Sequence, residues 1–348
     1  MRKLITALIL ILSMAVSAFA QAADARAKAE AVLKQAREAI GGEKKLKELQ
    51  SLTANGSLRQ SFGDRQMEGE LQIDLMMPDK IMTTTAMQFG GSPVGARIAT
   101  LNGDQFWNDF IPAMSGGGPG GGMIRMGVGP GGPGGGDPNS PMAKYQQMSQ
   151  RRDLALVMFG WLLAAPASAQ MDYSYAGEAP GPEDSKLDAI IVKSALGFNA
   201  VLYFDQQNHN LIGIKYKSKQ QRGVFGGGGR GPGGQGGQRQ AEGGQRQGSG
   251  GQGNAQPGQP GQPPQMTPEE RERFMKERQE RFEKAPEVDI SWAFSDYKSV
   301  GGLNLPHRLT KSEGGTPNEE WEISKFKINP KLTADKFVKK EKEKAGTN

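Results

Sequence analysis

The stretch "VDISWAFSDY", residues 288–297, decides how this chain folds. Its large apolar residues recur at every second position, as Val288, Ile290, Trp292 and Phe294. Successive side chains of a strand point to opposite faces, so a period of two predicts a strand with one buried face. The segment therefore belongs to a sheet that covers a core on one side and meets solvent on the other.

The same alternation recurs along the chain and predicts strands in twelve segments. They fall at residues 51–62, 71–75, 81–87, 95–102, 105–109, 170–179, 185–195, 198–207, 209–219, 288–297, 304–314 and 318–330. Turn residues such as Asn102-Gly103 separate them, and helices do not alternate with them, which predicts an antiparallel sheet. In the last segment the apolar phase slips between Ile323 and Phe326, which predicts a β-bulge.

Three helices are expected. The first begins at a capping Asp24, ends at Gly41-Gly42 and is followed by a short turn; its apolar face is Ala29, Val32, Leu33, Ala36 and Ile40. The second, residues 144–166, has an apolar half, Leu154–Ala165, that is too short to span a bilayer and is expected to be buried. Thr267, Pro268 and Glu270 form a capping box that starts a polar third helix.

The N-terminus has the pattern of a signal peptide. Arg2 and Lys3 precede the apolar run Leu4–Val16, and Ala18-Phe19-Ala20 fits a signal peptidase site. We expect residues 1–20 to be removed after Ala20 and residues 21–348 to form a single exported, periplasmic domain. The chain has no cysteine, which excludes disulfides, zinc thiolate sites, iron–sulfur clusters and cysteine nucleophiles.

Two Gly/Pro-rich low-complexity inserts, residues 115–140 and 222–265, interrupt the domain. Much of the formal charge of +6 lies in the signal peptide, the second insert and the lysine-rich C-terminal tail, so the folded part offers no basic face for nucleic acid. Neither insert continues into the Lys-Ser/Thr pair of a phosphate-binding loop. Because the entropic cost of closing a loop grows slowly with its length, a long insert destabilises the fold only slightly. We therefore interpret the second insert as an addition that the fold does not need. The alternative is a tether that meets an envelope partner or the cell wall.

No residue pattern indicates catalysis, a metal or a cofactor. His209 lies in a turn and His307 follows a proline within a strand, and we interpret both as surface or edge histidines. Asp205, Asn208 and Asn210 lack the spacing of a calcium loop and are typical of a hairpin turn. The sequence therefore predicts a protein that is not an enzyme and holds no cofactor.

The order of elements resembles the periplasmic lipoprotein carrier-like (LolA-like) family. The resemblance is carried by "AIGGEKKLKELQSLTANGSLRQ" (39–60), "GELQIDLMMPDKIMTTT" (69–85), "YSYAGEAPGPEDSKLDAIIV" (173–192), "AVLYFDQQNHNLIGIKY" (200–216), "FSDYKSVGGLNLPHRLTKSEGG" (294–315) and "EEWEISKFKINPKLTADKF" (319–337). It implies an α+β fold with a strongly curved antiparallel sheet, a half or incomplete β-barrel, and helices packed in its concave side. The inserts depart from the family pattern, and no arginine of this chain aligns with the cavity arginine of the carriers.

The resemblance further implies that the hollow binds a lipid, an acyl chain or a lipoprotein, as in outer-membrane lipoprotein sorting, with the protein peripheral to the membrane at most. The cavity residues expected on this reading are Leu71, Ile73, Trp107, Phe159, Leu162, Ile290, Trp292 and Phe294, with Trp292 beside residues 159–163. The alternative is an envelope structural or interaction protein with a filled core and Gly-rich arms that bind partner proteins. A hydrolase is a third, weaker reading.

Overall fold

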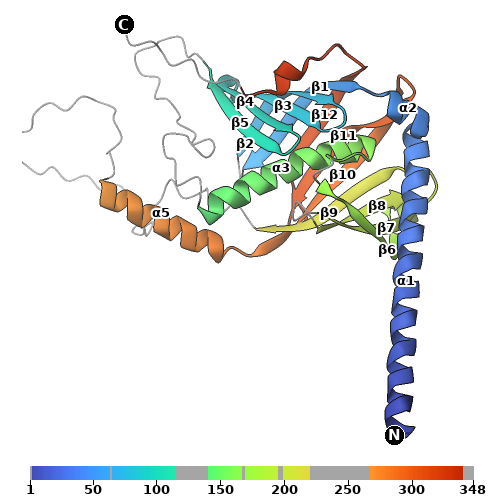
Figure 1. Cartoon of the computed structure of the whole chain (residues 1–348). Coiled ribbons are helices and arrows are strands. Elements are labelled where there is room, and N and C mark those ends of the chain that lie inside the picture. Colours follow the sequence, from blue (N-terminus) through green and yellow to red (C-terminus); the bar gives the residue numbers. More distant parts are fainter. Residues whose placement is uncertain are drawn as a thin grey trace, which may run out of the picture. The chain divides into compact units, whose positions relative to one another are not determined.

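A computed structural model describes residues 2–62, 65–113, 140–166, 169–194, 199–219 and 267–339 (Figure 1). Within these ranges it describes the side chains from residue 21 onward, except those of residues 62, 65, 89, 112, 268 and 271. The second predicted insert lies outside the described residues, as does the first except for Ser140. The chain divides into two units. The first contains the sheet and three helices, and the second contains one helix, which is described by itself below.

The first unit is built on an antiparallel sheet of twelve strands among the described residues. The strands are β1 (Ser51–Phe62), β2 (Arg65–Met76), β3 (Lys80–Phe89), β4 (Ser92–Asn102), β5 (Gln105–Pro112), β6 (Asp172–Pro180), β7 (Lys186–Lys193), β8 (Asn199–Asp205), β9 (Leu211–Lys219), β10 (Glu287–Val300), β11 (Leu303–Glu313) and β12 (Thr316–Ile328). Their order is β5-β4-β3-β2-β1-β12-β11-β10-β9-β8-β7-β6. The predicted α+β class and antiparallel sheet are thus confirmed.

The pairing of β1 with β12 joins the two ends of the chain at the middle of the sheet. Asn55 pairs with Lys325 and Gly56 pairs with Ile323, so Ser324 is an extra residue on β12. This confirms the predicted bulge between Ile323 and Phe326. A Cβ on Gly56 would lie 2.1 Å from the carbonyl oxygen of Glu322, so only glycine fits opposite the bulge.

Helix α1 (Arg2–Ile40) packs the face that the sequence predicts, with Ala29, Val32, Leu33, Ala36 and Ile40 all buried. It ends where Gly41 takes a φ of 150°. Asp24 does not cap it, because α1 continues without a break through the alanine-rich residues before it. The turn expected next is instead a second helix, α2 (Gly42–Glu48).

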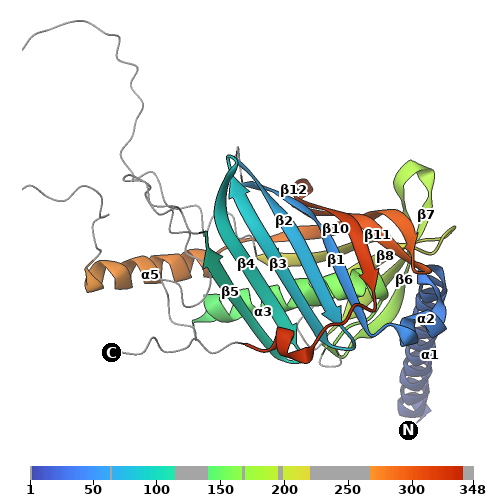
Figure 2. The same cartoon turned by 90° about the horizontal axis from the view of Figure 1, so that it is seen from above.

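Helix α3 (Pro141–Leu162) lies against one face of the sheet, here called the α3 face (Figure 2). Ser140 caps it by accepting a hydrogen bond from the Ala143 N–H, and it ends where Leu163 turns left-handed. From Leu154 to Leu162 every α3 residue is buried, as predicted for its apolar half. None of the helices in the described part of the chain is long and apolar enough to cross a membrane.

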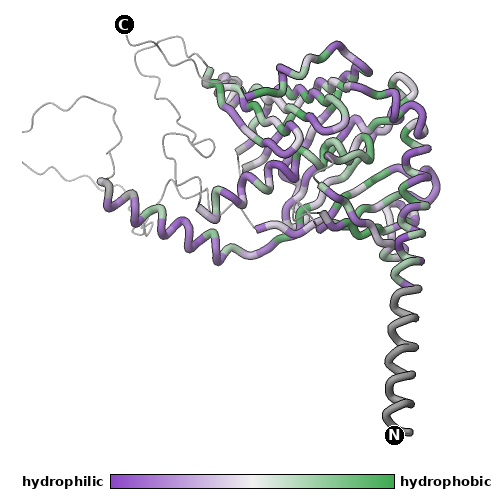
Figure 3. Tube along the Cα trace, viewed as in Figure 1, coloured by the Kyte–Doolittle hydropathy of each residue, from purple (hydrophilic) through white to green (hydrophobic). Residues whose placement is uncertain are grey.

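The apolar core lies on the α3 face of the sheet. Hydrophobic and hydrophilic residues alternate along the strands (Figure 3). Part of the opposite face is covered by the short helix η3 (Ala334–Phe337), whose Phe337 is buried. There the Asp74 carboxylate, 1% exposed, accepts hydrogen bonds from Thr53 (2.6 Å) and from Lys336 (2.6 Å). The C-terminal segment is thereby fixed to the face opposite α3.

The second unit contains α5 (Pro268–Glu283), the predicted polar helix. Thr267 accepts a hydrogen bond from the Glu270 N–H, and the Glu270 carboxylate accepts one from the Thr267 N–H. The predicted capping box is therefore confirmed.

Candidate functional site

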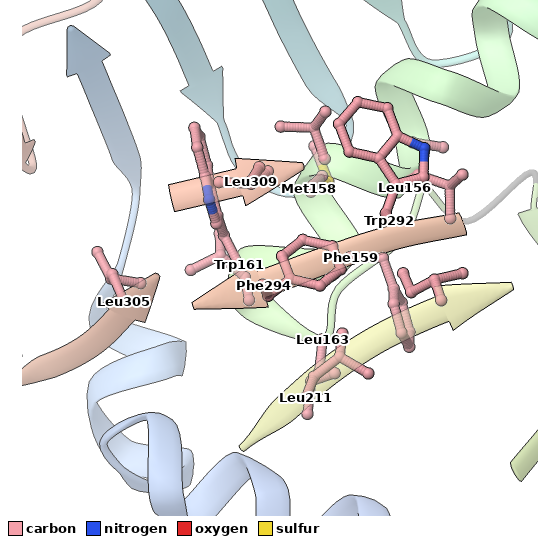
Figure 4. Close-up of a cluster of buried hydrophobic side chains, with 14 of the residues drawn as sticks. Leu156, Met158, Phe159, Trp161, Leu163, Leu211, Trp292, Phe294, Leu305 and Leu309 are labelled. Carbon is pink, nitrogen blue, oxygen red and sulfur yellow. The ribbon is translucent and has the colours of Figure 1, made fainter. Parts of the chain in front are cut away.

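Seven of the eight predicted cavity residues meet on the α3 face, in one apolar cluster: Leu71, Ile73, Phe159, Leu162, Ile290, Trp292 and Phe294. Figure 4 shows how α3 and β10 place several of them side by side. Each is at most 8% exposed. A side chain that lined an open hollow would keep accessible surface, so α3 closes this part of the face.

Trp107 does not join them. It pairs with Thr100 on β4, whereas its neighbour Phe106 pairs with Leu101, which belongs to the core under α3. Because neighbours along a strand point to opposite faces, Trp107 lies on the face away from α3. The sequence misleads here because β5 is apolar in both phases, with Phe106 and Phe110 on one side and Trp107 and Ile111 on the other.

A close contact between α3 and β10 involves Phe294. A Cβ on Gly160 of α3 would lie 2.3 Å from a ring carbon of Phe294. The Trp292 ring instead meets Trp321 of β12 edge to face, with the centroids 5.4 Å apart. The ammonium of Lys311 lies 5.1 Å from the Trp292 ring centroid, so this tryptophan borders a charged region.

His307 is a correction to the expected surface histidine. It is 8% exposed, and its ring packs edge to face on Phe326 at 5.0 Å. Its Nδ1 lies 3.1 Å from the carbonyl oxygen of Leu305. The histidine is buried because it shares the strand phase of the buried Leu305 and Leu309 on β11, a central strand of the sheet. His209 lies in a turn, as expected, with a φ of 58°.

The hairpin interpretation of residues 205–210 is confirmed. The Asp205 carboxylate accepts hydrogen bonds from the backbone N–H groups of Gln207 and Asn208, both at 2.9 Å. Across the described ranges, no three histidine or carboxylate side chains gather as metal ligands would.

Sequence reasoning missed a group of charged side chains on the α3 face, next to the middle of α3. We call it the charged cluster; it consists of Arg97 (β4), Arg152 and Asp153 (α3), Lys311 (β11) and Glu319 (β12). These residues are far apart in sequence, and only the strand order brings them together. The clue available in the sequence was that Arg97, Lys311 and Glu319 share the strand phase of buried neighbours.

Asp153 is the centre of the cluster. Its carboxylate lies 3.0 Å from the Lys311 Nζ and 3.2 Å from the Arg152 Nε, and it accepts a hydrogen bond from the Tyr216 hydroxyl at 3.2 Å. The Arg152 guanidinium also stacks over the Tyr216 ring at 4.3 Å. The Asp153 side chain is still 31% exposed, so this end of the α3 face reaches solvent.

The charges in the cluster shift one another's pKa values. Burial by itself would raise the pKa of Asp153, but the charges of Lys311 and Arg152 outweigh it and hold that pKa below its usual range. Burial would likewise lower the pKa of Lys311, but Asp153 outweighs burial and raises it. Burial and the charge of Asp153 together raise the pKa of Tyr216 to about 12. The Asp153–Lys311 pair is therefore fully charged at neutral pH.

Comparisons with known proteins bear on the fold alone. No family model and no curated protein matches this chain. Among solved structures, it is similar to a LolA superfamily protein from Nitrosomonas europaea, with 9% identity and a TM-score of 0.41 over 89% of this chain and 97% of that chain. It is also similar to a DUF1329 family protein from Desulfovibrio piger, with 9% identity and a TM-score of 0.44 over the same shares of the two chains. A structural match to the LolA superfamily is thus present at low sequence identity, and no function is carried over from it.

Proposed function

We propose that this protein binds an amphiphile, such as a lipid, a fatty acid or an acylated protein, without catalysing a reaction. The observation that carries the proposal is the division of the α3 face. It is apolar beneath α3 from Leu154 onward, where the core residues are buried, and charged around Arg152 and Asp153, where the Asp153 side chain is 31% exposed. An acyl chain matches the first region and a polar head group matches the second.

The proposal requires a sheet that curves around α3 as an incomplete barrel, and two contacts support this. Gln150 of α3 accepts a 2.9 Å hydrogen bond from Asn108 on β5, and Phe159 stacks on Tyr173 of β6 at 6.4 Å. β5 and β6 are the two edge strands. Positions 150 and 159 lie about 14 Å apart along a helix axis, whereas the edges of a flat sheet of this size are about 50 Å apart.

In this account α3 covers the acyl site. Because the apolar residues beneath it are closed to solvent, a chain enters only if the second half of α3 moves away from β10. The tight contact of Gly160 with Phe294 opposes that movement, and ligand binding offsets the loss of the contact.

Export to the periplasm and a role in lipoprotein sorting are part of the proposal. The described α1 residues that pack against the core, from Ala29 to Ile40, all follow Ala20. This apolar face of α1 would therefore remain in the chain after cleavage at Ala20. An N-terminal sequence beginning at Gln21 in material from the envelope supports this part, and a retained Met1 contradicts it.

The second candidate is an envelope interaction protein with a permanently filled core. The observation that favours it is the low exposure, at most 8%, of the seven predicted cavity residues on the α3 face. Native mass spectrometry of the full chain purified from its host separates the two candidates. A bound mass of several hundred daltons that organic solvent extracts as a lipid supports the amphiphile site. A bare chain that also fails to bind added fatty acid supports the filled core.

A further inference from the structure

The charged cluster contains more positive than negative groups. Three cations, Arg97, Arg152 and Lys311, face the two carboxylates of Asp153 and Glu319. Asp153 is already shared by Lys311 and Arg152. Glu319 accepts hydrogen bonds from the Trp321 indole at 2.7 Å and from the Gln60 amide at 3.4 Å. Both carboxylates are therefore occupied by groups other than Arg97.

Arg97 is the cation without a partner. Its Nε is buried and makes no hydrogen bond with any described residue, and no ion pair joins it to another group in the described ranges. Burial lowers the pKa of Arg97, and the charges of Glu319 and Asp153 only partly offset that effect. An arginine nevertheless stays charged in proteins. A desolvated cation without a direct counter-charge destabilises the fold, which suggests that something else satisfies it.

The position of Arg97 links it to the apolar region. On the α3 face it pairs with Thr85 of β3, which in turn pairs with Leu71 of β2. Leu71 is one of the predicted cavity residues and is buried in the core. A head group at Arg97 therefore lies two strands from the start of the apolar region, within reach of a single acyl chain.

We propose that Arg97 binds the anionic head of the ligand, a carboxylate or a phosphate monoanion, and so selects anionic amphiphiles over neutral ones. This inference rests on the proposed function. The planar guanidinium of arginine presents two parallel N–H donors, which match the two oxygens of either anion. Thr85, half-buried beside Arg97, offers a hydroxyl donor to the same head. A free inorganic anion such as phosphate offers the same oxygens as the head group of an amphiphile. The test below therefore distinguishes an amphiphile from a free anion.

The test compares palmitic acid with hexadecanol, which has the same chain length and a neutral head, by displacement of a fluorescent neutral acyl probe from the full chain. The wild type is expected to bind palmitic acid about tenfold more tightly than hexadecanol, as a charge-assisted hydrogen bond predicts. Arg97→Met should abolish that preference by weakening palmitic acid much more than hexadecanol, while Arg97→Lys should retain part of it. Arg59→Gln is the matched control, because it removes the same charge from an exposed side chain that is paired with Glu320 and Glu322.

The outcomes separate this inference from the function on which it rests. Equal affinities for the two ligands in the wild type, or a preference that survives Arg97→Met, would overturn the role of Arg97 and leave the acyl site standing. Failure of both ligands and of the probe to bind would remove the proposed function itself. Inorganic phosphate should not displace the probe at millimolar concentration. If it does so through Arg97, the site is one for free anions and the inference is wrong.

Discussion

Gly160 of α3 and Phe294 of β10 approach each other so closely that a Cβ on Gly160 would lie 2.3 Å from the Cε1 of Phe294. Real side chains do not reach such distances, so any larger residue at position 160 must displace the ring or the helix. In the proposed function this contact opposes the movement of α3 away from β10.

Gly160→Ala should therefore destabilise the protein by about 1–3 kcal/mol, even though alanine favours a helix by about 1 kcal/mol over glycine. The measurement is the free energy of unfolding from urea titration. The control is the same substitution made in a Phe294→Leu protein. There Gly160→Ala should lower the free energy of unfolding by less, because leucine is smaller than phenylalanine and leaves room for the methyl group. A Gly160→Ala protein that is more stable than the wild type would show that the contact does not fix the helix.

The two half-buried cations Lys311 and Arg97 should respond oppositely to the same substitution. Lys311→Met leaves the Asp153 carboxylate without its main partner and should cost about 3 kcal/mol. Arg97→Met removes an unpaired, desolvated charge and should leave stability unchanged or raise it by about 1 kcal/mol. Thermal unfolding at pH 7 measures both, and equal losses in the two variants would contradict the assignment of Arg97 as the cation without a partner.

Asp153 should make stability depend on pH in acid. A carboxylate whose pKa is lower in the folded chain stabilises the fold above its unfolded pKa of about 3.9 and loses that effect as the pH falls through the folded pKa. Asp153→Asn should thus be less stable than the wild type at pH 7, and the difference should shrink below about pH 4. Asp104→Asn, in an exposed turn, should parallel the wild type throughout. A difference that stays constant from pH 7 to pH 2 would mean that the Asp153 charge does not stabilise the fold.

Replacing Gly226–Pro264 with a short Gly/Ser link should leave the midpoint of thermal unfolding nearly unchanged. The segment contains no apolar run that a core needs, and shortening a flexible loop changes its closure entropy only slightly. Calorimetry of the shortened chain checks this. A fall of ten degrees or more would indicate that the segment packs on the folded part.

Local patterns in the sequence were sufficient for most of the fold. The alternation around Trp292, the capping box at Thr267 and the phase slip before Phe326 each report a property of one segment, and each is confirmed. The face of Trp107 depends on which strands are neighbours, and no single segment encodes that. The charged cluster was missed for the same reason, because Arg97 meets Glu319 only through the pairing of β1 with β12.

The central claim, an acyl chain held on the α3 face, is tested most directly by quenching of tryptophan fluorescence with a dibrominated fatty acid. Of the four tryptophans, Trp161, Trp292 and Trp321 lie on the α3 face and Trp107 lies on the opposite face. The account predicts saturable quenching in the wild type, and Trp107→Phe should retain all of the quenched signal. Quenching that never saturates, or that disappears with Trp107→Phe, would contradict a site beneath α3.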